Sequence, residues 1–187
     1  MPLLSAAEPL PARPRRVVVA GTSGSGKTTL AARVAMALGI RHVEIDALFH
    51  GPGWTPRPGF EAEVESFTAE PAWVTEWQYR SVRALLVERA DLLLWLDLPT
   101  TVVMRQVITR TVRRRVHHQE LWNGNVEPPL RTIVTDPDHI VRWAWRTRHQ
   151  TEHRVRAVLR DHPDLPVVRL RSHREAESWV RGALEGA

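Results

Sequence analysis

The sequence predicts a three-layer α/β fold with a mainly parallel sheet. Strand-like and helix-like segments alternate along the 187 residues, and this alternation favours parallel strands joined by crossover helices. The first clear strand, residues 17–20, is a continuous apolar run rich in valine, as expected for a strand buried on both faces. A glycine-rich turn follows it, and apolar residues then recur at helical spacing up to Gly39, a typical helix C-cap.

The glycine-rich turn is a complete phosphate-binding loop. Residues 21–28 read Gly-Thr-Ser-Gly-Ser-Gly-Lys-Thr, which matches the G-x-x-x-x-G-K-[ST] pattern. Glycines let the backbone aim N–H groups at phosphate oxygens, and the following helix adds partial positive charge. The sequence therefore predicts a P-loop NTPase fold that binds a nucleoside triphosphate and Mg²⁺. The expected nucleotide-binding residues are Gly21, Ser23, Gly24, Ser25, Gly26, Lys27, Thr28 and Thr29.

Lys27 is the one lysine among the 26 lysine and arginine residues of the chain. Its compact ammonium on a flexible stem can follow a phosphate during transfer, whereas a planar guanidinium fills the space differently. We therefore expect Lys27 to be catalytic and Thr28 to hold Mg²⁺. Guanine recognition through Asn-Lys-x-Asp is excluded because no second lysine exists, so the expected nucleotide is ATP. The Leu-Ser-Gly-Gly-Gln signature of ABC ATPases is also absent from the sequence.

Composition removes several other classes of protein. The chain has no cysteine, which excludes disulfides, thiolate metal sites and cysteine nucleophiles and favours a cytoplasmic location. Its nine histidines show no HExxH spacing, so no protein-bound zinc is expected. No apolar run approaches the length of a membrane span. The net charge of +5 allows nucleic acid as a partner, but 21 acidic residues interspersed with the basic ones favour an ordinary solvated surface.

The organisation predicted from periodicity and turn residues is one domain, residues 16–187, preceded by a proline-rich disordered leader, residues 1–15. Further strands are expected at residues 42–45, 73–75, 92–96 and 165–170. Further helices are expected at residues 60–69, 81–89, 100–115, 138–161 and 175–184. Residues 116–131 contain Asn123-Gly124 and Pro128-Pro129 and should form a loop or small lid.

Three carboxylates follow predicted strands, at Asp46, Glu76 and Asp97. Ligands of open parallel sheets bind at the carboxyl ends of the strands, where the phosphate loop also lies. We expect Asp46 to orient the phosphate acceptor and Glu76 to lie near Mg²⁺. The competing interpretation is that these residues are solvated turn or cap residues, and it is favoured for Asp97.

Arginines on the later helices are candidates for closing over the phosphates. Arg110 shares one helical face with Arg113 and Arg114, and Arg146 lies on the next long helix. Arg110 and Arg146 are the first choices for a catalytic role, against the alternative that both belong to a solvated basic face. Trp54, in a loop rich in glycine and proline, is the candidate for stacking on the acceptor.

Taken together, these residues resemble the P-loop kinases of the adenylate kinase type, most of all the adenylate-kinase-like group known as DNA topology modulation proteins. The resemblance runs from residue 17 to the C-terminus and rests on residues 21–29, 45–54, 73–80, 96–99 and 142–146. It implies a five-stranded parallel sheet of order 2-3-1-4-5 with Asp46 beside the acceptor. The family's Asp-Gly-x-Tyr segment, near Mg²⁺ and the acceptor, reads Glu76-Trp77-Gln78-Tyr79 here, followed by Arg80 as a further acceptor-binding candidate.

The leading hypothesis is a small-molecule or nucleotide kinase that transfers the γ-phosphate of ATP to a hydroxyl or phosphate acceptor. Trp77 stands where the family has glycine and fills space near the ligand, which indicates a changed substrate or a loss of transfer with ATP binding kept. The alternative is an ATP-dependent regulatory protein that binds DNA or a protein partner without phosphotransfer. The expected partners are a nucleotide and a small molecule, with no membrane, in a monomer or dimer.

Overall fold

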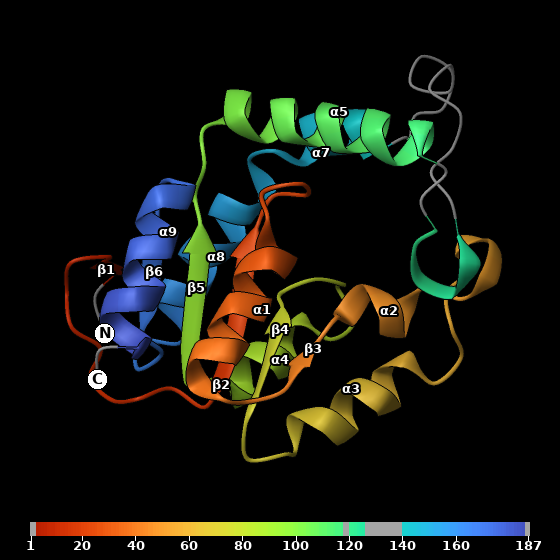
Figure 1. Ribbon diagram of the computed structural model, residues 1–187. Helices are drawn as coiled ribbons and strands as arrows, with labels where there is room; N and C mark the ends of the chain where they lie inside the picture. The colour runs from red at the N-terminus through yellow and green to blue at the C-terminus, as the bar shows by residue number, and fades with distance from the viewer. Residues whose placement is uncertain (1–2, 118–119, 126–139, 186–187) are drawn as a thin grey trace.

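The computed structural model describes residues 3–117, 120–125 and 140–185, and a six-stranded sheet lies at its centre (Figure 1). The strands are β1 (Leu3–Ser5), β2 (Arg16–Gly21), β3 (His42–Val43), β4 (Trp73–Glu76), β5 (Leu92–Leu96) and β6 (Val167–Leu170). Their order is β1-β6-β5-β2-β4-β3, and every neighbouring pair is parallel. The five predicted strands therefore appear in the predicted order, and β1 extends the sheet at one edge.

Helices cover both faces of the sheet and the end toward which β5 points (Figure 1). They are α1 (Lys27–Leu38), α2 (Ile45–Phe49), α3 (Phe60–Thr68), α4 (Arg83–Arg89), α5 (Thr100–Val116), α7 (Ile140–Thr147), α8 (Gln150–Asp161) and α9 (His173–Trp179). Short helical turns are η1 (Pro52–Trp54), η2 (Trp122–Gly124) and the π-helical η3 (Val180–Glu185). None of the helices within these described ranges is long and apolar enough to cross a membrane.

Two apolar clusters flank the sheet because neighbouring residues of a strand point to opposite faces. Val17 and Val19 pack toward α1, α9 and η3 on one face. Val18 and Ala20 pack toward α3, α4 and α8 on the other. Because helices cover both faces of the sheet, β2 is apolar at consecutive positions. The predicted three-layer architecture is confirmed.

The first difference from the sequence prediction lies in residues 1–15, which were expected to be a disordered leader. Leu3–Ser5 instead forms β1, which pairs with β6 and takes the edge of the sheet. Leu4 is only 6% exposed and belongs to the cluster beside α1. The physical reason is that a short apolar segment covers the otherwise open edge of β6. The strand ends in a turn in which the Glu8 N–H donates to the Ser5 carbonyl over 3.2 Å.

The second difference concerns residues 42–45, which were predicted to form one strand. β3 ends at Val43, and Ile45 begins the short helix α2. The Ile45 N–H donates to the Glu76 carboxylate over 3.1 Å, so it makes no backbone hydrogen bond to the neighbouring strand. Asp46 therefore lies in the first turn of a helix and not at the end of a strand.

The third difference is a break in the long helix predicted at residues 138–161. The structure has two helices, α7 and α8, separated at Arg148 and His149. The Thr147 hydroxyl bonds back to the Trp143 carbonyl over 2.7 Å, a contact that bends helices. The Thr22 hydroxyl, from the phosphate loop, donates to the Arg148 carbonyl over 3.3 Å, so the break is tied to that loop.

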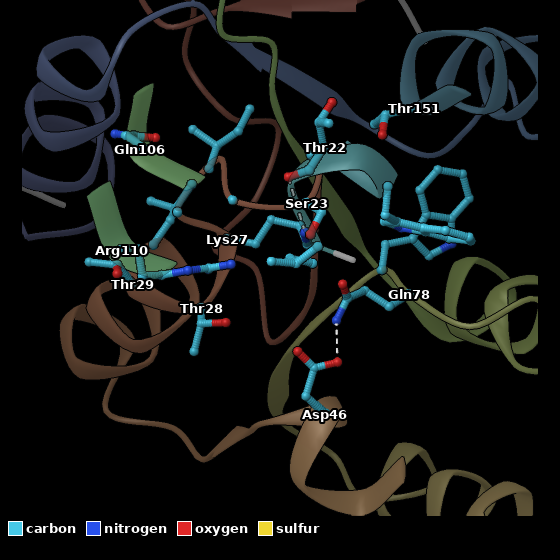
Figure 2. Close-up of a pocket in the computed structure, with 18 of the residues that line it drawn as sticks. Thr22, Ser23, Lys27, Thr28, Thr29, Asp46, Gln78, Gln106, Arg110 and Thr151 are labelled. Atoms are coloured by element: carbon cyan, nitrogen blue, oxygen red, sulfur yellow. Dashed lines mark hydrogen bonds between the residues drawn. The ribbon is translucent and has the colours of Figure 1, made fainter. Parts of the chain in front are cut away.

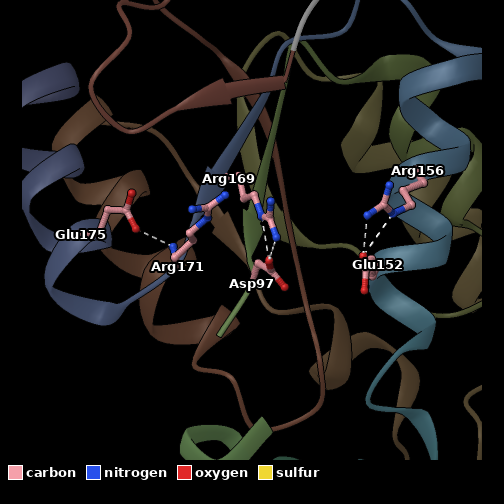
Figure 3. A network of polar contacts seen from close by, with 6 residues as sticks. All are labelled: Asp97, Glu152, Arg156, Arg169, Arg171 and Glu175. Carbon is pink, nitrogen blue, oxygen red and sulfur yellow. Dashed lines mark hydrogen bonds and ion pairs between the residues drawn. The ribbon is translucent and has the colours of Figure 1, made fainter. Parts of the chain in front are cut away.

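At the carboxyl end of β5, Asp97 does not cap the next helix. It accepts hydrogen bonds from the Arg169 guanidinium of β6, including one of 2.7 Å from Nε, and the same guanidinium lies 4.8 Å from the centre of the Trp95 ring (Figure 3). This pair joins β5 to β6 just before the chain turns into α5. Of the lid predicted at residues 116–131, residues 118–119 and 126–131 lie outside the described part.

Candidate active site

The phosphate loop connects the end of β2 to the start of α1, and its glycines are required by its geometry. Gly24 and Gly26 have φ values of +82° and +94°, in the left-handed region that side chains disfavour. A Cβ atom on Gly24 would lie 2.1 Å from the Val107 side chain of α5, and one on Gly21 would lie 2.4 Å from the Ser25 hydroxyl. The loop is therefore closely fitted against both itself and α5.

Lys27, the first residue of α1, is 7% exposed, and its Nζ donates to the Thr22 carbonyl over 3.3 Å. Burial lowers the pKa of the Lys27 ammonium, and the charges of Asp46 and Glu76 raise it, while Arg110 lowers it further. Figure 2 shows Arg110 reaching from α5 toward Lys27. An anion beside Lys27 would favour its charged form, which suits a phosphate site.

Glu76, at the end of β4, is 1% exposed and is held on three sides. The His42 ring donates to one oxygen over 3.2 Å and the Ile45 N–H donates to the other, while the Thr28 hydroxyl lies close enough to lower the pKa of the carboxyl. Burial raises the pKa of Glu76, but these hydrogen bonds outweigh burial and hold the pKa below its ordinary value. The predicted Thr28 and Glu76 are thus neighbours.

The oxygen donors at this point fit Mg²⁺. A hydroxyl and a carboxylate are hard ligands, and Mg²⁺ in proteins takes one or two such groups together with phosphate oxygens and water. Within the described ranges, no group of three or more acidic, histidine or cysteine side chains could hold a metal ion without phosphates. The pair therefore suits a metal that arrives with a nucleotide.

Asp46 is fixed by its neighbours through one oxygen. Its Oδ1 accepts from Gln78 Nε2 over 2.7 Å (Figure 2). The same oxygen accepts from the Tyr79 hydroxyl over 2.6 Å. Burial, followed by the Asp46 charge, raises the pKa of Tyr79, so this hydroxyl stays protonated and keeps donating. Among the described residues none donates to Oδ2, which remains able to accept a proton or a hydrogen bond from a ligand.

An open cavity of about 2000 Å³ connects these groups. That volume exceeds the roughly 300–1,000 Å³ of a typical small-molecule pocket, so the cavity has room for a nucleotide and a second ligand together. Most predicted site residues line it: Gly21, Ser23, Gly24, Gly26, Lys27, Thr28, Thr29, Asp46, Trp54, Arg80 and Arg110. Ser25 and Glu76 are buried behind the lining.

Arg146 is the predicted residue that the structure does not bring to this cavity. Its side chain is exposed, and its guanidinium lies 5.1 Å from the centre of the Trp143 ring on α7. Arg154, one helix later on α8, lines the cavity instead. The predicted helix from 138 to 161 was continuous, and the observed break at Arg148 and His149 changes which arginine faces inward.

Arg154 belongs to an arginine cluster with Arg80 and Arg83 on the acceptor side of the cavity. Burial lowers the pKa of Arg83, and the positive charges of Arg154 and Arg80 lower it further, so the three guanidiniums lie close enough to repel one another. In the described part of the chain, no carboxylate pairs with any of the three. Arg83 was missed by sequence reasoning, although its position three residues after Arg80 could have indicated it.

Other residues that sequence reasoning missed are the partners of the predicted ones. Gln78 and Tyr79 belong to a segment that carries the family resemblance. Their hydrogen bonds to Asp46 could not be predicted from the spacing of residues in the sequence. His42 of β3 pairs with Glu76 of the neighbouring strand β4. Trp122 and Asn125 come from a segment that the sequence identified only as lid.

The parallel sheet and the phosphate loop together make a P-loop fold. The structure is similar to a gluconokinase from Sinorhizobium meliloti 1021, with 21% identity over 94% of this chain and 97% of that chain and a TM-score of 0.50. It is also similar to a putative kinase from Chloroflexus aurantiacus j-10-fl, with 14% identity over 91% and 97% and a TM-score of 0.52. A shikimate kinase from Bacteroides thetaiotaomicron aligns with 14% identity over 90% and 96% and a TM-score of 0.49.

At these identities the likeness shows the fold alone. No model of a protein family matches the chain, and no curated protein matches it either. The predicted kinase-like P-loop fold is therefore confirmed. The resemblance to adenylate kinases and to the DNA topology modulation group stays a prediction.

Proposed function

We propose that the protein is an ATP-dependent phosphotransferase that acts on a small-molecule or nucleotide acceptor. The observation that carries this proposal is that Lys27 and Asp46 lie on one cavity, although they come from separate elements. They are near enough for the Asp46 charge to raise the pKa of Lys27. A site that only bound ATP would need the lysine but not a fixed carboxylate opposite it.

On the donor side, the backbone N–H groups of the loop and Lys27 bind the ATP phosphates, and Arg110 lies close enough to join them. Most catalysis of phosphoryl transfer comes from positioning and charge neutralisation, which this arrangement supplies. Mg²⁺, held beside Thr28 and Glu76, would neutralise further phosphate charge when bound. Arg146 is not part of this proposal because it faces away from the cavity.

On the acceptor side, Asp46 orients the attacking group through Oδ2. With a hydroxyl acceptor, the proton passes to Asp46 as the oxygen bonds to phosphorus and the bond to ADP breaks. With a phosphate acceptor, the attacking oxygen carries no proton and Asp46 contributes orientation only. Trp54 forms the aromatic wall beside this point.

The arginine cluster Arg80, Arg83 and Arg154 further defines the acceptor. Arg83 and Arg154 are partly buried, Arg80 is exposed, and no described carboxylate pairs with any of them. Partly buried guanidiniums without a carboxylate are costly unless a ligand supplies negative charge. We therefore propose that the acceptor carries a carboxylate or phosphate group in addition to its attacking oxygen. The cluster is built by α4, α8 and the segment after β4, and not by the phosphate loop itself.

The experiment is ADP release measured with Mg²⁺·ATP and matched pairs of acceptors, each pair differing in one anionic group. Gluconate with glucose, and nucleoside monophosphates with their nucleosides, are suitable pairs. We expect stimulation by the anionic member of at least one pair, lost in Lys27→Ala. If no compound raises ADP release above the Lys27→Ala background, the kinase proposal fails.

The regulatory alternative predicts a different result in the same protein. DNA binding that requires ATP and weakens steeply with salt, together with no acceptor-stimulated ADP release, would favour it.

A further inference from the structure

Two segments about seventy residues apart in the sequence are joined beside the acceptor site. One is the loop Gly51–Thr55, which contains η1, and the other is Leu121–Asn125, which contains η2 and follows α5 in the chain. The two turns lie in contact. We call this pair of segments the clasp.

Asn125 is the centre of the clasp and is only 4% exposed. Its side-chain Nδ2 donates to the Gly51 carbonyl over 2.9 Å, and its Oδ1 accepts from the Trp54 N–H over 2.9 Å. The same Nδ2 also donates to the Trp122 carbonyl over 2.8 Å. One side chain thus satisfies a backbone acceptor, the Gly51 carbonyl, and a backbone donor, the Trp54 N–H, as a neighbouring strand would.

Trp122 and Asn123 extend the clasp toward the residue that orients the acceptor. The Trp122 indole N–H donates to the Glu44 carboxylate over 2.6 Å, and Glu44 is the N-cap position of α2, two residues before Asp46. The Asn123 amide donates to the His50 carbonyl over 2.5 Å, and the His50 ring stacks on Trp122.

Two clasp residues have unusual backbone conformations. Trp54 has a φ of +61° and Asn123 has a φ of +57°, values that residues other than glycine adopt infrequently. Such conformations persist only where surrounding contacts hold them. The hydrogen bonds of Asn125 on each side of these residues supply that support.

The clasp lines the same cavity as the phosphate loop and α5. Val107 of α5 packs against Gly24 of the phosphate loop, and Arg110 of α5 lies near Lys27. Leu121 and Trp122 of the clasp line the cavity together with Arg110 and Lys27. A nucleotide bound at the loop would therefore occupy a cavity that the clasp helps to enclose, and a shift of Leu121–Asn125 would reach the loop Gly51–Thr55 through Asn125.

We propose that Asn125 is a positioning residue that couples nucleotide binding at the phosphate loop to the acceptor wall formed by His50, Trp54 and Trp122. The coupling requires the loop Gly51–Thr55 and the segment Leu121–Asn125 to move together. The buried side-chain amide of Asn125 joins them by its hydrogen bonds. The inference rests on the proposed ATP binding and goes beyond it, because ATP binding alone predicts no effect of the clasp.

The test is hydrogen exchange of the full chain with and without Mg²⁺ and the non-hydrolysable ATP analogue AMP-PNP. In the wild type, the analogue should slow exchange in residues 21–29 and also in residues 47–57, by about fivefold or more, the lower end of coupling between sites. In Asn125→Ala, protection of 21–29 should remain while protection of 47–57 is lost. Asn125→Asp, which keeps the acceptor for Trp54 but loses the donor to Gly51, should lose most of the second effect.

Asn123→Gly is the matched control, because it removes one exposed hydrogen bond from the same segment, accepts the φ of +57° without strain and leaves Asn125 in place. It should keep protection in both regions. Equal loss in Asn123→Gly, unchanged protection of 47–57 in Asn125→Ala, or no wild-type protection of 47–57 would each overturn the role of Asn125.

A further variant tests the coupling if Asn125→Ala does not fold. Trp122→Phe keeps an aromatic side chain but loses the pyrrole ring with its N–H to Glu44, and we expect it to weaken protection of 47–57 without affecting 21–29. Unchanged protection there, in the absence of a folded Asn125 variant, would overturn the coupling. Lack of protection in 21–29 of the wild type would instead contradict ATP binding and the proposed function itself.

Discussion

The donor side and the acceptor side of the cavity are built in opposite ways. One continuous segment, residues 21–29, forms the donor side, and its backbone makes most of the site. The acceptor side is assembled from side chains of α2, the segment after β4, η1, η2 and α8. A site made by local backbone is recognisable from a short motif, whereas a site made by converging side chains appears only once the chain has folded.

The two sides also differ in how they tolerate change. The donor side has glycines with almost no free space around them, at Gly21 and Gly24. The acceptor side depends on hydrogen bonds to one carboxylate and on uncompensated arginines. Substitutions on the donor side should therefore abolish nucleotide binding, while those on the acceptor side should change selectivity and turnover.

The largest effect should come from Lys27. We expect Lys27→Ala and Lys27→Arg each to lower turnover about 10³-fold, because the guanidinium does not fit the space that the buried ammonium occupies. Lys27→Met should do the same and also raise the melting temperature of the nucleotide-free protein, since burial of the ammonium is unfavourable there. Retained turnover in Lys27→Arg would show that any positive charge suffices.

Asp46→Asn should lower acceptor-dependent turnover about 10²-fold, at the lower end for a general base, because the loose transition state of phosphoryl transfer needs little proton removal. ATP affinity, measured by calorimetry, should stay unchanged. Tyr79→Phe, which removes one hydrogen bond to Asp46 and keeps the ring, should have a smaller effect on turnover. An ATP affinity that falls with turnover in Asp46→Asn would contradict the separation of the two sides.

Gly24→Ala and Gly59→Ala form a matched pair, since both glycines have φ of +82°. A Cβ atom on Gly59 has open space, whereas one on Gly24 meets Val107. Both variants should lose about 1–2 kcal/mol of unfolding free energy to backbone strain. Gly24→Ala should lose about 1–3 kcal/mol more from overpacking, together with ATP binding. Equal losses in denaturant unfolding would contradict the close fit of α5 on the loop.

Arg154→Ala and Arg146→Ala compare the arginine that the structure places at the cavity with the one predicted from sequence. Loss of a charged hydrogen bond costs about 1.5–3 kcal/mol, so Arg154→Ala should raise the acceptor KM about tenfold or more without changing the KM for ATP. Arg146→Ala should leave both constants unchanged. The reverse result would return Arg146 to the site and exclude Arg154.

The smallest effect concerns pH and Glu76. Its folded pKa lies below the ordinary value of 4.5, so the unfolded chain binds more protons at acidic pH. The stability that Glu76 contributes is therefore complete above pH 4.5 and is lost as the pH falls through the folded pKa. Glu76→Gln should be less stable than the wild type near neutral pH, with the difference shrinking below about pH 4.5 in urea unfolding. A constant difference would mean that the His42 pair does not hold this pKa down.

The sequence was sufficient for the layers, the strand order and the phosphate loop because these follow from local patterns. The apolar run at Val17–Ala20 and the loop glycines determine their own surroundings. It was insufficient at Leu3–Ser5, where pairing with a distant strand decides the structure, and at Ile45, whose N–H bonds to Glu76 thirty-one residues away.

The candidate site follows the same rule. Asp46, Thr28 and Glu76 were predicted as functional from their positions relative to strands, and the structure brings them near Lys27. Arg154 lines the cavity and Arg146 does not, because the helix breaks at Arg148 and His149, where Thr22 bonds to the Arg148 carbonyl. Asn125 had no signal in the sequence, since its partners, Gly51 and Trp54, are identified only by folding.

The most direct test of phosphotransfer is ³¹P NMR of the protein incubated with Mg²⁺·ATP and the anionic acceptors. We predict a new phosphate-ester or phosphoanhydride resonance that grows in step with ADP and is absent in Lys27→Ala and strongly reduced in Asp46→Asn. Release of inorganic phosphate alone, equal to ADP with every acceptor, would contradict the account.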